Sequence, residues 1–237
     1  MLEIINYSKS YNGKDKTVDN INLTINEGDL FAFIGHNGAG KSTTIKSIVG
    51  ILDFEGGDIL INGLSIKKNP VECKKQIAYI PDNPDLYESL TGIKYLNFIS
   101  DIYQISKEQR KEQIEKYAKL FGLTDSLNNY IASYSHGMKQ KLALISAFIH
   151  NPKILVLDEP FVGLDPKASF LVKQVMREFC QNGGIIFFST HILEVAQKLC
   201  NKIAIIKNGK LIKTGLMEEV IGDAALEDVF MELTEHE

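Results

Sequence analysis

The sequence predicts an α/β fold, with a mixed core sheet, an antiparallel β-subdomain and an inserted helical subdomain. Three observations predict it. Continuous apolar runs that end in glycine or acidic residues are typical of strands buried on both faces. The first quarter shows the apolar–polar alternation of antiparallel strands, and the middle has helical patterns. In the final third, strands alternate with helices, which is typical of a parallel sheet.

The first elements are expected to be strands. Alternation predicts strands at 2–7 and 18–25, and a short strand bounded by turns at 57–61. The apolar run 30–34 ends in glycines, which suits a strand buried on both faces. A helix should follow over 41–50.

Two helices are expected in the middle of the chain. Ser106 and Gln109 have the spacing of a capping box, which would begin a helix with apolar residues at helical spacing. A second helix should run over 137–149, before Asn151 and Pro152.

The final third contains two buried strands, predicted at 154–157 and 185–189. Between them, Asp165 and Pro166 are typical of the N-cap and the first residue of a helix, which should end at the glycine pair 183–184. Asn208 and Gly209 lie between two short apolar stretches and predict a two-residue β-hairpin.

Composition limits the possible functions. The chain has 237 residues, 44% of them hydrophobic, which is enough for one large core or two fused subdomains. A formal net charge of −4 argues against a nucleic-acid partner, because such surfaces usually carry a basic stripe. Cys73, Cys180 and Cys200 have no metal-ligand spacing and are expected to be buried thiols, the last two in helices.

No segment has the features of a membrane anchor. The first ten residues lack the basic and apolar regions of a secretory signal. The apolar runs are much shorter than the roughly 20 residues that span a bilayer. A function at a membrane would therefore require a partner.

A glycine-rich motif lies between the predicted strand 30–34 and the helix that follows it. It fits the pattern GxxxxGK[ST] and consists of Gly35, His36, Asn37, Gly38, Ala39, Gly40, Lys41 and Ser42, followed by Thr43. Glycines let the backbone curl around an anion, and the amides of the helix N-terminus attract it. We expect all nine residues to bind a nucleotide, with Lys41 at the β- and γ-phosphates and Ser42 on Mg²⁺.

Two acidic residues end the predicted strand 154–157. Ligands of open α/β sheets bind at the carboxyl ends of the strands, so Asp158 is expected to lie beside the glycine-rich loop and to bind Mg²⁺. Glu159 should point to the other side of the backbone and orient or deprotonate a water molecule. An acid pair alone also fits a helix N-cap; the phosphate motif gives it its significance.

With these residues in place, the chain resembles the ATP-binding cassette (ABC) ATPases over nearly its whole length. The segment Tyr134–Met138 stands where that family has its LSGGQ signature. The resemblance implies the ABC ATPase form of the P-loop NTPase fold, with ATP and Mg²⁺ as ligands. It also implies that Tyr11 stacks on adenine, although without the resemblance a surface strand residue is the preferred interpretation of Tyr11.

The resemblance further implies a second ABC ATPase subunit, identical or related. In this family, each ATP lies between the phosphate loop of one subunit and the signature of the other. The signature residues expected to contact ATP of the partner are Ser135, His136, Gly137 and Met138. Asp165 is expected in the dimer interface and His191, the family's switch histidine, is expected at the γ-phosphate as a catalytic residue.

Three positions depart from the family pattern. His136 replaces the first signature glycine and Met138 replaces glutamine, whereas Gly137 is retained. Asp82 stands where most members have a glutamine that contacts Mg²⁺ and the attacking water. An aspartate there adds negative charge beside the γ-phosphate, so it is expected to bind the metal or to alter the timing of hydrolysis.

Several functions remain open at this point. The signature, residues 81–84 and the tail 225–230 resemble bacterial ABC-2-type exporters related to drugs, peptides or bacteriocins. The leading hypothesis is the ATPase of such an exporter, peripheral at the cytoplasmic face of the membrane through a polytopic permease. A soluble ABC ATPase is the alternative; a P-loop kinase or GTPase disagrees with the signature and His191.

The expected domain organisation follows from the same resemblance. Residues 1–215 are predicted to form the ATP-binding domain, with a helical subdomain over about 84–150. Residues 216–237 are predicted to form a short helical tail. Permease contacts are expected near 82–98, where Leu86, Tyr87 and Leu90 are apolar, although core packing explains these three equally well.

Overall fold

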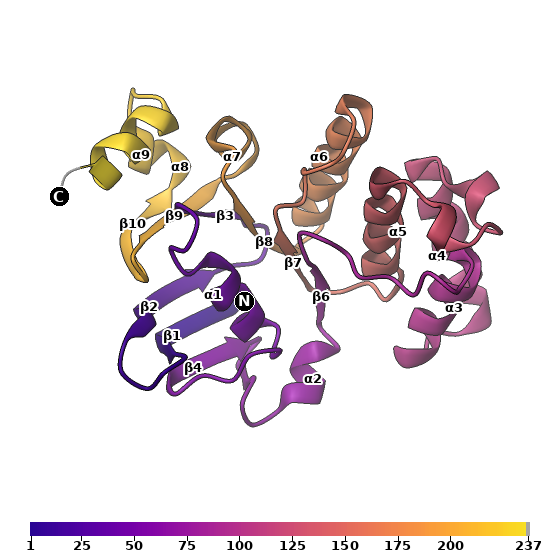
Figure 1. Cartoon of the computed structure of the whole chain (residues 1–237), viewed down its shortest axis with the longest axis horizontal. Helices are drawn as coiled ribbons and strands as arrows, with labels where there is room; N and C mark the ends of the chain where they lie inside the picture. The colour runs from indigo at the N-terminus through magenta and orange to yellow at the C-terminus, as the bar shows by residue number, and fades with distance from the viewer. Residues whose placement is uncertain (236–237) are drawn as a thin grey trace.

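The computed structural model describes residues 1–235, and its centre is a six-stranded sheet with the order β10-β9-β3-β8-β7-β6 (Figure 1). Five of these strands run parallel, and β10 pairs antiparallel with β9. The predicted mixed sheet is therefore confirmed. Its strands are β3 (Leu30–Ile34), β6 (Ile77–Ile80), β7 (Ile154–Asp158), β8 (Ile185–Thr190), β9 (Lys202–Lys207) and β10 (Lys210–Leu216).

A second, four-stranded antiparallel sheet has the order β2-β1-β4-β5. It comprises β1 (Leu2–Ser10), β2 (Lys16–Ile25), β4 (Gly56–Ile61) and β5 (Leu64–Ser65). Together with helix α1 (Lys41–Ile48), its apolar side chains cover one face of the central sheet. The side chains of β3 alternate between the two faces, since Phe31 and Phe33 join this core and Ala32 and Ile34 join the opposite one. That strand is buried on both sides, as predicted.

The opposite face of the central sheet is covered by helices. Helices α3, α4 and α5 gather at one end of the molecule, and α8 and α9 lie at the other end (Figure 1). None of the helices within residues 1–235 is long and apolar enough to cross a membrane. The helices after α1 are α2 (Pro70–Lys74), α3 (Gly92–Ile102), α4 (Lys107–Phe121), α5 (His136–Ile149), α6 (Pro166–Gln181), α7 (Leu193–Leu199), α8 (Met217–Ile221) and α9 (Leu226–Glu235).

Local sequence signals fix several element boundaries. Ser106 and Asp165 are N-caps, with side-chain oxygens that accept hydrogen bonds from the amides of Gln109 (3.2 Å) and Ala168 (2.8 Å). Asn208, with φ 49°, and Gly209, with φ 76°, form the predicted hairpin turn between β9 and β10.

One predicted helix position is wrong. Cys200 follows the last residue of α7 in an extended conformation, because the chain must leave the helix to enter β9 at Lys202. Cys180 lies in α6 as predicted, and all three thiols are free and buried.

Helices α8 and α9 lie in the segment predicted as a helical tail. Their buried residues are Met217, Val220, Leu226 and Phe230, which belong to the same core as the helical face of the central sheet. The division between residues 1–215 and a separate tail stays a prediction.

The residue after α5, His150, is a half-buried titratable group. The ring of His150 stacks on Tyr103 with a centroid separation of 3.7 Å, and its Nε2 lies 3.3 Å from the carbonyl oxygen of Ile77. Burial lowers the pKa of His150 from 6.5 to about 4, because the charged imidazolium is poorly solvated there. His150 is therefore neutral in the folded protein at neutral pH.

This histidine predicts a pH dependence of folding. As pH falls below 6.5, the unfolded chain binds a proton at His150 that the folded protein does not bind until about pH 4. Stability should fall in that window, by at most about 3 kcal/mol from this group. His150→Phe keeps a ring against Tyr103 and removes the titration, so its free energy of unfolding should fall less than that of the wild type. Urea unfolding across this pH range checks it; parallel curves would contradict the prediction.

Candidate active site

The carboxyl ends of β3, β8 and β7 open into one cavity of about 470 Å³. These strands pair in parallel, so the loops that follow them leave the sheet at the same edge. A further loop, after β6, also reaches the cavity. Six residues predicted for the site line it: Gly35, His36, Asn37, Asp82, Glu159 and His191.

The glycine-rich loop has the geometry of an anion-binding turn. Gly38 and Gly40 have φ values of 81° and 107°, which glycine adopts without strain. Gly40 is the N-cap of α1 and provides no side-chain acceptor for the first amides of that helix. Those amides point toward the space where an anion would bind.

Lys41 lies inside the curl of this loop. Its side chain is buried, and Nζ donates hydrogen bonds to the carbonyl oxygens of Gly35 (2.7 Å) and His36 (3.2 Å). Burial lowers the pKa of Lys41, while the nearby carboxylates of Glu159 and Asp158 oppose that shift. The amine is thus held where a phosphate would exchange for the two carbonyl oxygens.

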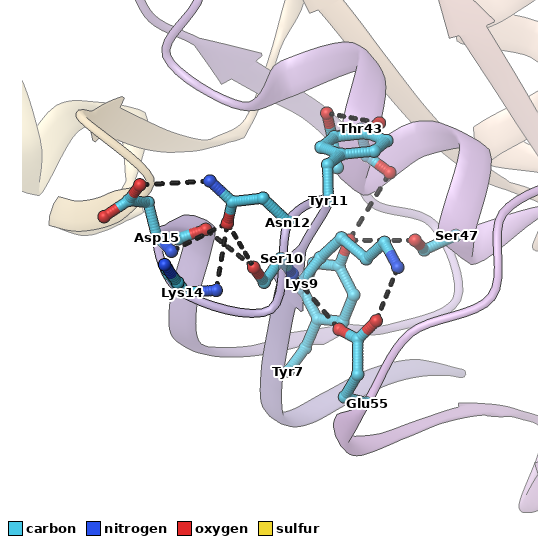
Figure 2. A network of polar contacts seen from close by, with 10 residues as sticks. All are labelled: Tyr7, Lys9, Ser10, Tyr11, Asn12, Lys14, Asp15, Thr43, Ser47 and Glu55. Atoms are coloured by element: carbon cyan, nitrogen blue, oxygen red, sulfur yellow. Dashed lines mark hydrogen bonds and ion pairs between the residues drawn. The ribbon is translucent and has the colours of Figure 1, made fainter.

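Tyr11 stands over the start of α1 (Figure 2). Its ring is 62% exposed, and its hydroxyl lies 3.3 Å from Oγ1 of Thr43. The turn after it is held by Asn12, whose Oδ1 accepts hydrogen bonds from the amides of Lys14 (3.0 Å) and Asp15 (2.9 Å). An exposed aromatic face fixed beside the glycine-rich loop is suited to stacking on a planar base.

A polar network beneath Tyr11 ties this turn to its surroundings (Figure 2). The Nζ of Lys9 lies 2.6 Å from Glu55 and 5.6 Å from the centroid of the Tyr11 ring. The second oxygen of Glu55 accepts a hydrogen bond from the amide of Ser10 at 3.1 Å. The Tyr7 hydroxyl, 2.8 Å from Oγ of Ser47, connects the sheet to α1. The strand that leads into the turn is therefore anchored.

The two acids at the end of β7 have different partners. Asp158 is buried and accepts a hydrogen bond from the Ser189 hydroxyl at 2.5 Å. Glu159 has a φ of 50°, rare for a non-glycine residue, and its amide donates to the carbonyl oxygen of Ser189 at 3.2 Å. Its Oε1 lies 2.9 Å from Nδ1 of His191, and Oε2 accepts from the His191 amide at 3.4 Å. Glu159 and His191 are therefore paired in the cavity.

Asp82 approaches the cavity from the loop after β6 and is exposed there. The nearby Tyr79 has a pKa raised to about 12, chiefly by burial and further by the charges of Asp158 and Asp82. Ser42 is also exposed, at the first turn of α1. Hydroxyl and carboxylate oxygens are suitable ligands for Mg²⁺. Within residues 1–235, however, no three acidic, histidine or cysteine side chains already converge on a metal position.

The signature residues lie elsewhere. Ser135 is the N-cap of α5, where its Oγ accepts a hydrogen bond from the Met138 amide at 3.3 Å, and His136 and Gly137 form the first turn. The three helices α3, α4 and α5 are grouped away from α1 (Figure 1). The structure therefore does not bring the signature to the glycine-rich loop of the same chain.

The signature does contact the loop before α6. A Cβ atom on Gly163 would lie 2.2 Å from the His136 ring, so the ring packs directly on that glycine. Asp165, at the end of this loop, caps α6 and lies 3.8 Å from Nζ of Lys141 on α5. The amide of Ala168 lowers the pKa of Asp165. The two segments expected at a dimer interface lie side by side in one chain.

Sequence reasoning missed four residues of the cavity: Val162, Thr190, Leu193 and Phe230. Three follow strand ends that were identified, so adjacency along the chain could have suggested them. Phe230 comes from α9, and the apolar pattern of that tail predicts a buried face but not what it contacts.

The hydrogen bond to Asp158 predicts a stability difference between two buried serines. Ser189→Ala removes the donor to a buried carboxylate and should lower the free energy of unfolding by about 1–3 kcal/mol. Ser100→Ala is the matched control, since that buried hydroxyl donates only to the Leu96 carbonyl of its own helix, at 2.7 Å. It should cost less than about 1 kcal/mol. Urea unfolding at neutral pH measures both; equal losses would contradict the assignment.

Comparisons with known proteins agree with this geometry. The family model described as ABC transporter matches residues 18–162. The ABC-type transporter ATP-binding protein EcsA of Bacillus subtilis strain 168 is 35% identical, over 94% of this chain and 93% of EcsA. The linearmycin resistance ATP-binding protein LnrL of the same strain is 32% identical, over 96% of this chain and 74% of LnrL.

Solved structures share the fold. A structure described as the ATP-binding subunit of an ABC transporter superimposes with a TM-score of 0.94 and 34% identity, over 99% of both chains. A dimeric ATP-binding cassette, MJ0796 bound to ADP and Pi, has a TM-score of 0.83 at 23% identity, over 92% of this chain and 99% of that one, which shows a common fold.

Proposed function

This chain belongs to the ABC transporter family as an ATP-binding and ATP-hydrolysing subunit, and on that premise we propose that it works as a head-to-tail dimer that drives a membrane exporter. The observation that carries the proposal is the separation of the signature turn of α5 from the cavity at the glycine-rich loop. A serine-capped helix N-terminus is a second phosphate cradle, and it has no phosphate to bind within its own chain.

In a two-fold dimer, the signature of one copy can bind the phosphates of the ATP that is held by the glycine-rich loop of the other copy. In a C₂ pair, the signature of each copy faces the glycine-rich loop of the other, and both sites form by symmetry. The packing of His136 on Gly163 supports this arrangement, since it joins the signature to the loop that carries Asp165. The dimeric cassette MJ0796 has the same fold. The partner is a second ABC ATPase subunit, here taken as a second copy.

Within each site, the proposed roles follow the geometry. Tyr11 stacks on adenine, the amides of residues 35–43 surround the phosphates, and the Lys41 amine turns from the two loop carbonyls to the terminal phosphates. Ser42, Asp158 and Asp82 would hold Mg²⁺, which neutralises charge on phosphate oxygens when bound.

Hydrolysis transfers the γ-phosphoryl group to water. Glu159 orients that water and accepts its proton, while the P–O bond to ADP breaks. His191, 2.9 Å from Glu159, fixes the carboxylate and contacts the γ-phosphate. Positioning and charge neutralisation then account for most of the acceleration.

An exposed pair of aromatic side chains is the proposed site of contact with the permease. Leu86 is buried and Leu90 is half-buried, so these two belong to the core. Tyr87 and Phe98 are 57% and 40% exposed, and their rings meet edge to face at 5.6 Å. We assign the pair to the contact with a polytopic permease at the cytoplasmic face of the membrane. The relative LnrL is a resistance protein, which supports export.

Glu159→Gln tests both catalysis and dimer formation. The amide cannot accept the proton, so ATP turnover should fall by about 100-fold or more, while ATP still binds and holds the dimer together. Phosphate release and gel filtration with ATP measure the two effects. Glu27→Gln, at an exposed site outside the cavity, is the control and should behave like the wild type. A wild-type turnover rate in Glu159→Gln would contradict a catalytic role for this residue. A full turnover rate from a wild-type protein that stays monomeric would contradict the proposed dimer.

Asp82→Gln tests the metal assignment. Loss of the carboxylate should raise the Mg²⁺ concentration needed for half-maximal ATPase activity about three- to tenfold, since Mg²⁺ prefers charged oxygen ligands. Asp85→Asn is the matched control, because Asp85 is exposed on the same loop and does not line the cavity. Identical Mg²⁺ titrations for wild type and Asp82→Gln would exclude Asp82 from the metal site.

A further inference from the structure

Phe230 of α9 reaches into the active-site cavity. Its side chain is only 6% exposed, yet it lines the same cavity as Glu159 and His191. Its ring lies 4.9 Å from the ring of His36, centroid to centroid, at an interplanar angle of 58°. A residue near the end of the described chain therefore packs on the glycine-rich loop that follows β3.

The same helix is fixed to the segment that follows His191. Leu226, the first residue of α9, is fully buried, and its amide donates to Oε1 of Gln197 on α7 at 3.0 Å. Helix α7 begins at Leu193, which also lines the cavity. One short helix thus contacts both the glycine-rich loop and the helix that continues from the switch histidine.

His36 is a position where such packing has consequences. It lies in the glycine-rich loop, where its carbonyl oxygen accepts a hydrogen bond from the amide of Ala39 at 3.1 Å. The same oxygen accepts a hydrogen bond from the Lys41 amine at 3.2 Å. A ring packed on His36 therefore restrains the part of the loop that receives the lysine.

We propose that Phe230 is a positioning residue for ATP hydrolysis, which acts through His36 and couples α9 to the terminal-phosphate end of the site. The inference rests on the proposed function, because it assumes that the γ-phosphate lies in the cavity with Glu159 and His191. Tyr11 and its network, which would bind the base, are not among the residues that line this cavity. Lys41 also reaches the β-phosphate that ADP keeps, so the effect of Phe230 should be larger for ATP hydrolysis than for ADP binding.

The test compares ATP and ADP in one set of variants of the whole chain. Phe230→Ala should reduce kcat/KM for ATP about tenfold, while the Kd for ADP stays within about twofold of the wild type. Phe230→Tyr keeps the ring and should retain wild-type activity. Met231→Ala is the control on the same helix, since that side chain is 45% exposed, and it should change neither value.

Further variants separate positioning from a purely structural role. Phe230→Leu keeps apolar volume without the ring; it should fold like the wild type and still lose several-fold in kcat/KM, which keeps the proposal testable if Phe230→Ala does not fold. His36→Ala should lose activity by a similar factor, and the double variant His36→Ala/Phe230→Ala should lose little more than either single variant.

The outcomes distinguish the inference from the function on which it rests. Wild-type kcat/KM in folded Phe230→Leu and Phe230→Ala, or equal losses of ATP and ADP binding, would overturn the inference and leave the ATPase assignment intact. Absence of ATP hydrolysis by the wild-type protein would instead overturn the proposed function. Selective loss for ATP, rescued by tyrosine, supports the positioning role.

Discussion

The parallel pairing of β3, β8 and β7 is the constraint on which the active site depends. In this register, Ile34 pairs with Thr190 and Asp158 pairs with Ser189, so three loops leave the sheet at one level. Each strand is buried on both faces and has little freedom to shift. A slip of β7 by one residue would turn the Asp158 side chain to the other face of the sheet, away from the Ser189 hydroxyl. The packing of the sheet therefore fixes the positions of the active-site residues.

Polar groups at this buried edge satisfy one another. The Ser189 hydroxyl donates to Asp158, and the Ser189 carbonyl accepts from the Glu159 amide. These bonds offset the cost of burying a carboxylate and hold Glu159 in a backbone conformation that costs on the order of 1 kcal/mol or more. The left-handed backbone conformation at Glu159 directs Asp158 and Glu159 to different partners. A strand that simply continued would not place one carboxylate on Ser189 and the other on His191.

The sequence predicted those parts of the molecule that local rules determine. The N-caps at Ser106 and Asp165 and the hairpin at Asn208 follow from side chains that bind nearby backbone. The cavity residues from the glycine-rich loop and the strand ends follow from motif and topology. The direct contact of Glu159 with His191 and the packing of Phe230 on His36 were not predictable, because both join segments that only tertiary packing brings together. The position of Cys200 was predicted wrongly because the pattern did not show that α7 ends at Leu199, directly before the chain enters β9.

The positions of the catalytic residues and of the signature residues determine how nucleotide binding can be coupled to movements of the rest of the molecule. Glu159, His191 and Lys41 are held at the carboxyl-terminal edge of the central sheet, whereas Ser135 and His136 are carried by α5 in the group of helices at one end of the molecule (Figure 1). In the dimer proposed above, closure around ATP would therefore bring one rigid part of each copy against a different rigid part of the other. The contact of His136 with Gly163 links the signature to the loop after Glu159, so each half-site has a mechanical connection to the other through a single chain. Because cores are close-packed and resist gradual deformation, such a connection favours two discrete arrangements, open and closed, over a continuum.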